Sequence, residues 1–72
     1  MEQFKIRTYG RTELALLYNP GLTDYSAYRK LMQWIAHSRP LTLRLEELGY
    51  DPRRRTVTPL EVRAIVEALG EP

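Results

Sequence analysis

Apolar side chains recur at helical spacing in four segments of this chain, and a short segment before them alternates apolar and polar residues. The alternation over Phe4–Thr8 and into Tyr9 has the period of two residues that is typical of strands, so it predicts a short N-terminal strand or extended arm. The first helix is expected to begin directly after Gly10, because Glu13 can accept a hydrogen bond from the backbone of that N-cap residue.

The second helix is the longest predicted element and runs from about Asp24 to His37. It follows the turn Asn19-Pro20-Gly21, which ends the first helix because proline disfavours the α conformation in the residue before it. Either Thr23 or Asp24 is a suitable N-cap for this helix. One of its faces is apolar and carries Ala27, Leu31, Trp34 and Ile35. The opposite face is polar, so the helix is predicted to pack on one side only.

Two further helices are predicted from local start and stop signals. Pro40 fits the first turn of the third helix, and Gly49 fits its end. The segment Thr58–Glu61 combines an N-cap threonine, a proline in the first turn and a capping-box glutamate, so a fourth helix begins there and ends at Gly70. A brief strand is expected at Thr56-Val57. The pattern therefore predicts an all-α fold of four helices with a short N-terminal strand or arm.

Length and composition limit the size and the class of this protein. Its 72 residues form one predicted domain, residues 1–72, and its 43% apolar and 28% charged residues are typical of a globular chain. A core of this size contributes about 3–5 kcal/mol, and without cysteine no disulfide adds to it. Because the first residues contain no apolar run that resembles a signal peptide or a membrane span, we expect a cytoplasmic protein with no membrane partner.

The charge of the chain is unevenly distributed. Eleven Lys and Arg residues against nine Asp and Glu give a net charge of +2. Residues 1–55 hold ten basic and six acidic residues (10 − 6 = +4), whereas residues 56–72 hold one basic and three acidic residues (1 − 3 = −2). Nine of the eleven basic residues are Arg, whose planar guanidinium suits bidentate contacts with phosphates and base edges. This distribution permits nucleic-acid binding without establishing it.

Side-chain catalysis and metal binding have no recognisable residue set in this sequence. There is one His and no Cys, and no acidic residue lies one helical turn from His37. Glu46 and Glu47 are adjacent, which places them on different sides of a helix. Each glycine has a nearby turn or cap role, so no phosphate-binding loop is present. We therefore expect a protein that is not an enzyme, with no cofactor, metal or small-molecule substrate.

The segment of residues 11–37 has the layout of a helix-turn-helix, in which a short helix and a turn precede a longer helix that enters the major groove of DNA. The candidate residues for binding double-stranded DNA are Ser26, Arg29, Lys30, Gln33 and His37 on the second helix, and Arg53, Arg54 and Arg55 in the loop before the last helix. Arg29 and Gln33 are suited to base edges, whereas Lys30 and His37 are suited to phosphates. The basic residues Lys5, Arg7 and Arg11 would extend this DNA-binding footprint.

Each of these features also has a purely structural interpretation. The polar face of the second helix is what any amphipathic surface helix presents to solvent, and the triple Arg is also typical of a solvated loop. Trp34 lies on an apolar face, which favours core packing over base stacking. An exposed Tyr25 next to Arg29 would instead mark an interface. The alternative function is therefore a protein–protein interaction adaptor of unknown partner, and another copy of this chain is one candidate partner.

Short motifs along nearly the whole chain match those of a known family. These motifs include Tyr9-Gly10, Glu13-Leu14-Ala15, Trp34-Ile35, Leu48-Gly49-Tyr50, Thr58-Pro59 and Leu69-Gly70-Glu71-Pro72. With them the chain resembles a small bacterial family, the domain of unknown function number 4248. The resemblance implies a free-standing helical domain of this length, and it brings no catalytic residue or cofactor. The segment from Glu13 to Ile35 is also similar to the helix-turn-helix of excisionase-type proteins, although the turn here is longer.

Overall fold

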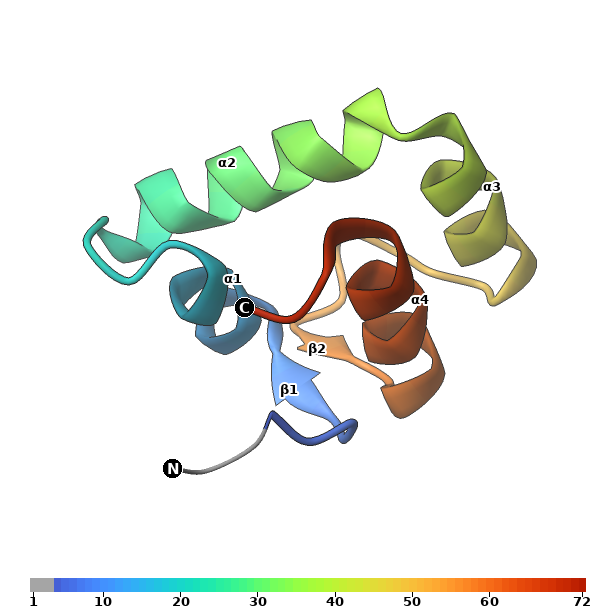
Figure 1. Ribbon diagram of the computed structural model, residues 1–72, viewed down its shortest axis with the longest axis horizontal. Coiled ribbons are helices and arrows are strands. Elements are labelled where there is room, and N and C mark those ends of the chain that lie inside the picture. The colour runs from blue at the N-terminus through green and yellow to red at the C-terminus, as the bar shows by residue number, and fades with distance from the viewer. Residues whose placement is uncertain (1–3) are drawn as a thin grey trace.

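The computed structural model describes residues 4–72, which form four helices and one two-stranded antiparallel sheet (Figure 1). The elements in chain order are β1 (Tyr9–Gly10), α1 (Arg11–Tyr18), α2 (Asp24–His37), α3 (Arg39–Glu47), β2 (Thr56–Val57) and α4 (Pro59–Leu69). The predicted fold class is thereby confirmed, and α2 has the predicted bounds. Residues 1–3 of the predicted 1–72 domain lie outside the described residues.

The sheet joins the start of the chain to the segment before α4. Tyr9 pairs with Val57 and Gly10 pairs with Thr56, so the strand expected at Thr56-Val57 is confirmed. β2 has only two residues because the next one, Thr58, already forms the N-cap of α4. A partner strand of this length leaves no backbone hydrogen-bonding groups with which a longer β1 could pair.

Of the two forms predicted for the N-terminal segment, strand or extended arm, residues 4–8 adopt the arm, because the sheet begins only at Tyr9. The arm instead folds against the Tyr9 side chain, whose hydroxyl donates a hydrogen bond of 2.7 Å to the carbonyl oxygen of Lys5. The Phe4 ring stacks on the Tyr9 ring with centroids 5.3 Å apart, and the Arg7 guanidinium lies 3.7 Å from the centre of the same ring. These side-chain contacts take the place of the backbone hydrogen bonds that a longer strand would form.

The caps that the sequence predicted for the first two helices are present. The Gly10 backbone N–H donates to Glu13 Oε1 at 3.0 Å, and the Thr23 hydroxyl accepts from the Ser26 N–H at 3.3 Å. Each bond satisfies a backbone donor that the helix itself leaves without a partner. The two caps fix where α1 and α2 begin and therefore how long the turn between them is.

The end of α3 is a Schellman motif, as the sequence predicted. The Tyr50 N–H donates to the Leu45 carbonyl at 2.9 Å, and the Gly49 N–H donates to the Glu46 carbonyl at 3.0 Å. Gly49 has φ of 80°, a left-handed conformation that a residue with a Cβ rarely adopts. The motif turns the chain from α3 into the loop that carries Arg53, Arg54 and Arg55.

The start of α4 is a capping box extended by an ion pair. The Thr58 hydroxyl accepts from the Glu61 N–H at 3.3 Å, and Glu61 Oε1 accepts from the Thr58 N–H at 2.9 Å. The Glu61 side chain is completely buried, and Oε1 also accepts a hydrogen bond from the Arg54 guanidinium. Its second oxygen, Oε2, has no hydrogen-bond partner among residues 4–72. The predicted capping glutamate therefore also binds the arginine loop to α4.

Every helix and both strand segments contribute to one apolar core. The buried apolar residues are Tyr9, Leu14, Ala15, Ala27, Leu31, Ile35, Leu41, Leu45, Val57, Val62, Ala64 and Ile65. In Figure 1 α2 runs along one edge of the molecule, α1 lies beside its N-terminal half, and the C-terminal residues return to α1. The side of α2 that faces away from the core is consequently left open to solvent.

Candidate nucleic-acid interface

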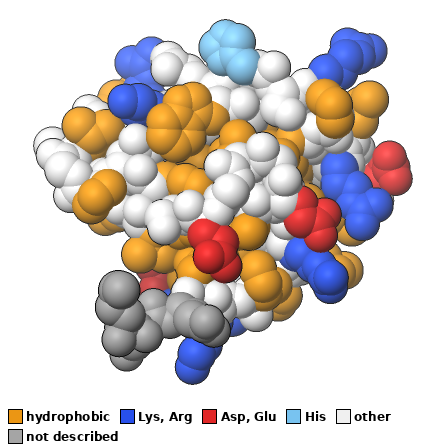
Figure 2. Space-filling model, in the orientation of Figure 1, with side chains coloured by type: hydrophobic (Ala, Val, Ile, Leu, Met, Phe, Trp, Pro, Cys, Tyr) orange, Lys and Arg blue, Asp and Glu red, His pale blue; other side chains and the backbone are white. Residues whose placement is uncertain are grey.

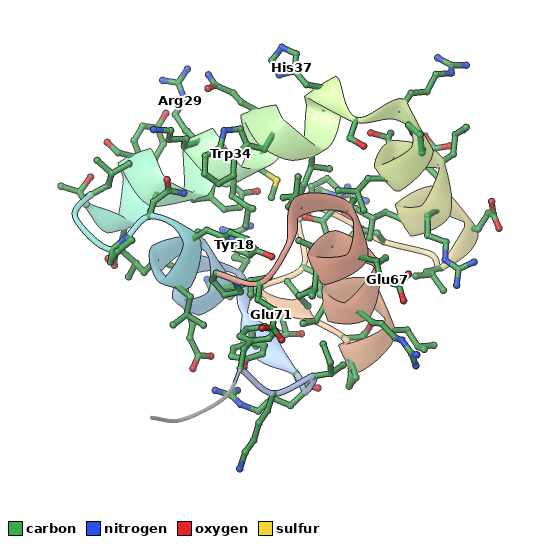
Figure 3. The ribbon with its side chains drawn as sticks, viewed as in Figure 1. Tyr18, Arg29, Trp34, His37, Glu67 and Glu71 are labelled. Carbon is green, nitrogen blue, oxygen red and sulfur yellow. The ribbon has the colours of Figure 1, made fainter. Side chains whose placement is uncertain are left out.

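The outer face of α2 carries all five of the helix residues that the sequence predicted to contact DNA. Ser26, Arg29, Lys30, Gln33 and His37 are all exposed. The residues on the opposite side of the helix, Ala27, Leu31 and Ile35, are buried. Figure 3 shows Arg29 and His37 on the side of α2 that points away from the rest of the molecule. The structure therefore brings these five side chains together on one accessible surface, which we call the α2 face.

Contacts one helical turn apart position the two cations of the α2 face. The Arg29 guanidinium lies 5.7 Å from the ring centre of Tyr25, and the Lys30 ammonium lies 5.8 Å from the ring of Trp34. Among residues 4–72, neither Arg29 nor Lys30 takes part in an ion pair. Aromatic rings orient these cations without neutralising them, so their charge stays available to a ligand.

The surroundings of the α2 face are basic over a longer stretch than its five residues. Residues 25–45 contain four Arg and Lys residues, Arg29, Lys30, Arg39 and Arg44, and no Asp or Glu. Figure 2 shows Lys, Arg and His side chains along the edge formed by α2, whereas the Asp and Glu side chains of that view lie away from this edge. The weak net charge of the whole chain is thus concentrated where the helix is exposed.

The three arginines of the loop differ in what they contact. Arg53 pairs with Asp51 at 3.3 Å, and the Arg53 backbone N–H and guanidinium together lower the pKa of the Asp51 carboxyl. Arg54 is held by the buried carboxylate of Glu61. Arg55 is exposed and enters no ion pair within the described residues. Of the three predicted phosphate contacts, Arg55 is therefore the one whose side chain the fold leaves free.

The arginine loop is anchored to α1 and to one flank of α2. The Pro52 carbonyl accepts hydrogen bonds from the Arg11 guanidinium at 3.0 Å and from the Tyr28 hydroxyl at 3.4 Å. The Arg11 backbone N–H donates to the Arg55 carbonyl at 2.9 Å. None of the hydrogen bonds or ion pairs among residues 4–72 links the loop arginines to the α2 face. The loop thus contacts α2 at its Tyr28 flank.

Two of the three basic residues that would extend the footprint, Arg7 and Arg11, have roles in the fold. Arg11 supports the loop, as described above, and Arg7 pairs with Glu13 at 3.1 Å. The Gly10 N–H and the Arg7 guanidinium lower the pKa of the Glu13 carboxyl. Lys5 is exposed and belongs to no ion pair of the described chain. The arm therefore adds less free positive charge than its sequence suggests.

The other flank of α2 carries an aromatic cluster that the sequence assigned to the core. Trp34 contacts the edge of Tyr18, with ring centroids 6.2 Å apart and an interplanar angle of 80°. The Tyr18 hydroxyl donates to the Gly70 carbonyl at 2.5 Å, and burial, with the negative charge of Glu71 adding to it, raises the pKa of Tyr18 to about 12. Trp34 is only partly buried, and it lines an open hollow together with residues of α2 and α4.

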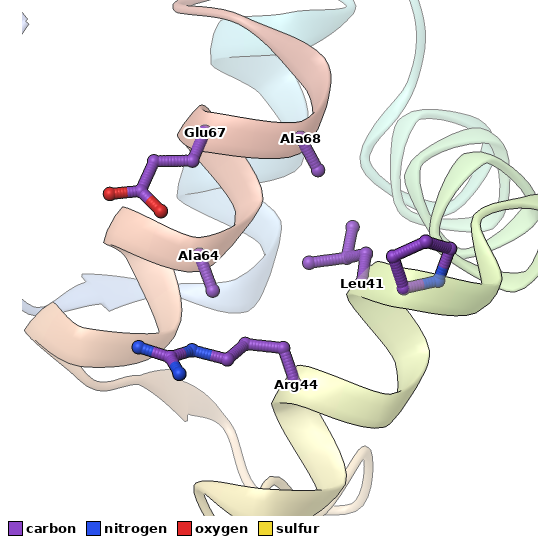
Figure 4. A pocket seen from close by; sticks show the side chains of 6 residues that line it. Leu41, Arg44, Ala64, Glu67 and Ala68 are labelled. Atoms are coloured by element: carbon purple, nitrogen blue, oxygen red, sulfur yellow. The ribbon is translucent and has the colours of Figure 1, made fainter.

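A second hollow lies between α3 and α4. Figure 4 shows it lined by Leu41 and Arg44 of α3 and by Ala64, Glu67 and Ala68 of α4. Glu67 is already paired with Arg63 at 3.3 Å on its own helix. This hollow therefore combines apolar side chains with the charged side chains of Arg44 and Glu67.

Within residues 4–72, no three His, Asp or Glu side chains gather where they could hold a metal ion. None of the helices in the described part of the chain has the length and apolar character needed to cross a membrane. In comparisons with known proteins, a family model described as "Domain of unknown function (DUF4248)" matches residues 5–72. No curated protein and no solved structure matches the chain.

Proposed function

This chain belongs to the DUF4248 family of domains of unknown function, and we propose that it is a small, non-enzymatic, helix-turn-helix-like protein that binds DNA or acts as an accessory in a DNA complex. In this proposal α1, the turn of residues 19–23 and α2 form the DNA-binding unit, and α2 lies against the major groove. A DNA ligand also implies the cytoplasmic location that we propose with it.

The observation that carries this proposal is the α2 face itself. Among the described residues, one side of the 14-residue helix α2 presents two cations without acidic partners, an amide and a hydroxyl, and no other described element covers that side. At 1.5 Å per residue the helix is about 21 Å long, and the major groove of B-DNA is about 12 Å wide and admits a helix. Positive charge on an uncovered helix is what phosphate contacts require.

The positions along α2 suggest a division of roles. Arg29 and Gln33 lie one turn apart in the middle of the face, where base edges would be met, and their side chains pair with guanine and adenine. Lys30 lies to one side of them and His37 lies at the end of the helix, where the phosphate backbone would pass. Ser26, in the first turn, can donate or accept toward either a base or a phosphate.

The proposal is tested by fluorescence anisotropy with a labelled DNA duplex at two salt concentrations. The logarithm of the binding constant for B-DNA falls with the logarithm of the salt concentration, with a slope of about −0.9 per phosphate contact. Four contacts therefore lower the affinity about 100-fold between 50 and 200 mM salt. The variant Arg29→Ala with Lys30→Ala should weaken binding strongly. Arg63→Ala is the matched control, because it removes an exposed helical arginine from α4. Absence of binding at low salt, or an equal loss of DNA affinity in both variants, would refute the proposal.

Base reading and phosphate contact are separated by a second comparison. Arg29→Ala should cost about 1–3 kcal/mol more on a preferred sequence than on random DNA, because a base contact is lost. Lys30→Ala and Arg55→Ala should weaken both duplexes to the same extent. Arg54 is unsuitable for this comparison, since its replacement also leaves the buried Glu61 without its cation. If Arg29→Ala lowers both affinities equally, α2 binds DNA without reading it.

One observation favours the adaptor alternative. Tyr25 has 70% of its surface exposed and lies against Arg29, and Leu17 in α1 and Leu22 in the turn that follows it are also exposed. Exposed aromatic and apolar side chains are enriched in protein interfaces. This alternative predicts concentration-dependent self-association in sedimentation velocity, which Tyr25→Ser and Leu22→Ser should abolish. A monomer at all concentrations would count against self-association.

A further inference from the structure

The hollow beside α2 combines one aromatic, one apolar and two polar side chains. It is lined by Trp34 and His37 of α2, by Ser38 between α2 and α3, and by Leu69 at the end of α4. It is open to solvent, and it adjoins the α2 face because His37 belongs to both. In Figure 3 Trp34 lies between the labelled Arg29 and Tyr18, on the side of the molecule where α4 ends.

The Trp34 ring is held in place by its neighbours and remains partly accessible. Tyr18 packs its ring against Trp34 nearly at a right angle, and the Tyr18 hydroxyl is itself fixed on the Gly70 carbonyl. The Lys30 ammonium lies 5.8 Å from the Trp34 ring centre. An indole fixed in this way beside a cation is a preorganised surface on which a planar ring can stack, because little side-chain entropy remains to be lost.

The polar groups of the hollow have unused hydrogen-bonding capacity. The Ser38 hydroxyl takes part in no hydrogen bond with residues 4–72, although the Ser38 backbone N–H and carbonyl are both used. His37 Nδ1 lies 2.7 Å from the Gln33 carbonyl oxygen, so Nδ1 carries the proton and Nε2 is left for a ligand. A ring with polar edges would therefore find a stacking surface, an apolar wall and a hydroxyl in one place.

We propose that this hollow binds a single unpaired nucleobase of the DNA, which stacks on Trp34 and forms an edge hydrogen bond with the Ser38 hydroxyl. Leu69 forms the apolar wall, and the Lys30 ammonium at the rim contacts the phosphate of the same nucleotide. This inference rests on the proposed function and deepens it, since it assigns to the protein a preference for DNA with an exposed base. Stacking suits every base, so the hollow selects unpaired over paired DNA and not one sequence over another.

The source of the base is either a single strand or a duplex with an extrahelical nucleotide. Both present the same chemistry, a base free of its stack next to a phosphate. The lone tryptophan of the chain makes the site directly observable, because Trp34 is the only indole in the protein. A base stacked on Trp34 quenches the fluorescence of the whole protein.

The experiment titrates the full chain with four DNA ligands at one salt concentration. These are a ten-nucleotide oligothymidine, an abasic oligomer of equal length, a duplex with one bulged thymidine and the same duplex fully paired. We expect oligothymidine, the bulged duplex, or both, to quench Trp34 and to bind about 5-fold or more tightly than the matched ligand without a free base. Quenching by oligothymidine identifies a single strand as a source, and quenching by the bulged duplex alone identifies an extrahelical base.

Two variants test the residues, with affinities measured by anisotropy of labelled DNA. Trp34→Leu should lower the affinity for oligothymidine about 5- to 150-fold relative to the paired duplex. Leu60→Ala is the control, because it truncates an exposed apolar side chain on α4 outside the hollow and the α2 face, and it should leave the ratio of the two affinities unchanged. Ser38→Ala removes a hydroxyl that the fold does not use, so it should fold normally and lower the ratio about 2- to 10-fold.

The outcomes separate this inference from the proposed function. Salt-dependent duplex binding with equal affinity for oligothymidine and the abasic oligomer, and no change in Trp34 fluorescence, overturns the inference and leaves the α2 face as the DNA site. No binding of any of the four DNA ligands overturns both. An unchanged ratio in both Trp34→Leu and Ser38→Ala, with melting curves that show folded protein, also rejects the hollow as the base site.

Discussion

Replacing Glu61 with alanine is the sharpest test of how this small domain is held together. Glu61 is completely buried, and its Oε1 accepts hydrogen bonds from the Thr58 backbone and from the Arg54 guanidinium. The substitution removes both bonds at once and leaves the arginine loop without its attachment to α4. Glu13 makes a similar pair of contacts, with the Gly10 N–H and with Arg7, but at an exposed position.

The size of the effect follows from the two bonds. Loss of a capping interaction costs about 1 kcal/mol, and loss of a hydrogen bond to a charged group costs about 1.5–3 kcal/mol. Relief of the unpartnered Oε2 offsets part of this sum. We therefore expect Glu61→Ala to lower the free energy of unfolding by about 3 kcal/mol, most of the 3–5 kcal/mol typical of so small a core. Thr58→Ala, which loses only the cap, should cost about 1 kcal/mol.

Glu61→Gln is the informative companion. The amide oxygen keeps an acceptor where Oε1 lies, and the amide nitrogen takes the position of the unpartnered oxygen. The substitution removes the attraction to Arg54, whose side chain is 37% exposed, so that water screens part of the loss. We expect Glu61→Gln to cost about 1 kcal/mol, well below the cost of the alanine variant.

Urea denaturation measures these differences, followed by far-UV circular dichroism and by Trp34 fluorescence. For a domain of this size the slope is about 1 kcal/mol per molar urea, so Glu61→Ala should move the midpoint by about 3 M. A loss of unfolding free energy below about 1 kcal/mol for Glu61→Ala would refute the reasoning that the buried Glu61 acceptor holds the arginine loop to the start of α4. Equal losses for alanine and glutamine would show that charge, and not the acceptor position, is what matters.

Three further predictions follow from single side chains. Because the folded pKa of Tyr18 is about 12, above its ordinary value of 10.0, its contribution to stability is complete below pH 10 and is lost as pH rises through 12. Melting temperatures from pH 8 upward should therefore fall less in Tyr18→Phe, and parallel curves would contradict this. Because the pKa of Glu13 is lowered in the folded protein, this carboxylate contributes stability above its ordinary pKa of 4.5, and the contribution is lost as pH falls further. In Glu13→Gln the melting temperature should therefore fall less between neutral and acid pH. The same fall in both proteins would rule out this role. Gly49→Ala should cost about 1–2 kcal/mol in urea denaturation, because φ is 80° there, and a neutral result would mean that the turn adopts another conformation.

The helices could be located from the sequence because their ends are encoded locally. The caps at Gly10, Thr23 and Thr58 and the turn at Gly49 are each specified by residues within one helical turn, so neighbours in the chain suffice to predict them. The same holds for the α2 face, since amphipathic spacing assigns its five residues to one side of the helix without knowledge of the remaining chain. Their exposure then requires only that the opposite side is buried.

The sequence left open whether the N-terminal segment is a strand or an arm, because strand pairing depends on a partner far away in the sequence. Alternation over Phe4–Thr8 fits a strand, but β2 offers only Thr56 and Val57 before Thr58 begins the cap of α4. Period-two patterning describes which side of a strand would be buried, and it contains no information on how many partner residues exist. The arm uses its side chains around Tyr9 instead.

What the sequence alone determined is the set of helices, their caps and the polar side of α2, because each depends on residues within a few positions of one another. The tertiary structure decided which cations are free, since Arg54 is bound by a carboxylate seven residues away on another element and Arg11 by the carbonyl of Pro52. It also decided that Trp34 is both packed and accessible, because only the return of the chain at Leu69 and Gly70 forms the hollow beside it. Charge neutralisation and concavity arise between elements, and a linear pattern does not record them.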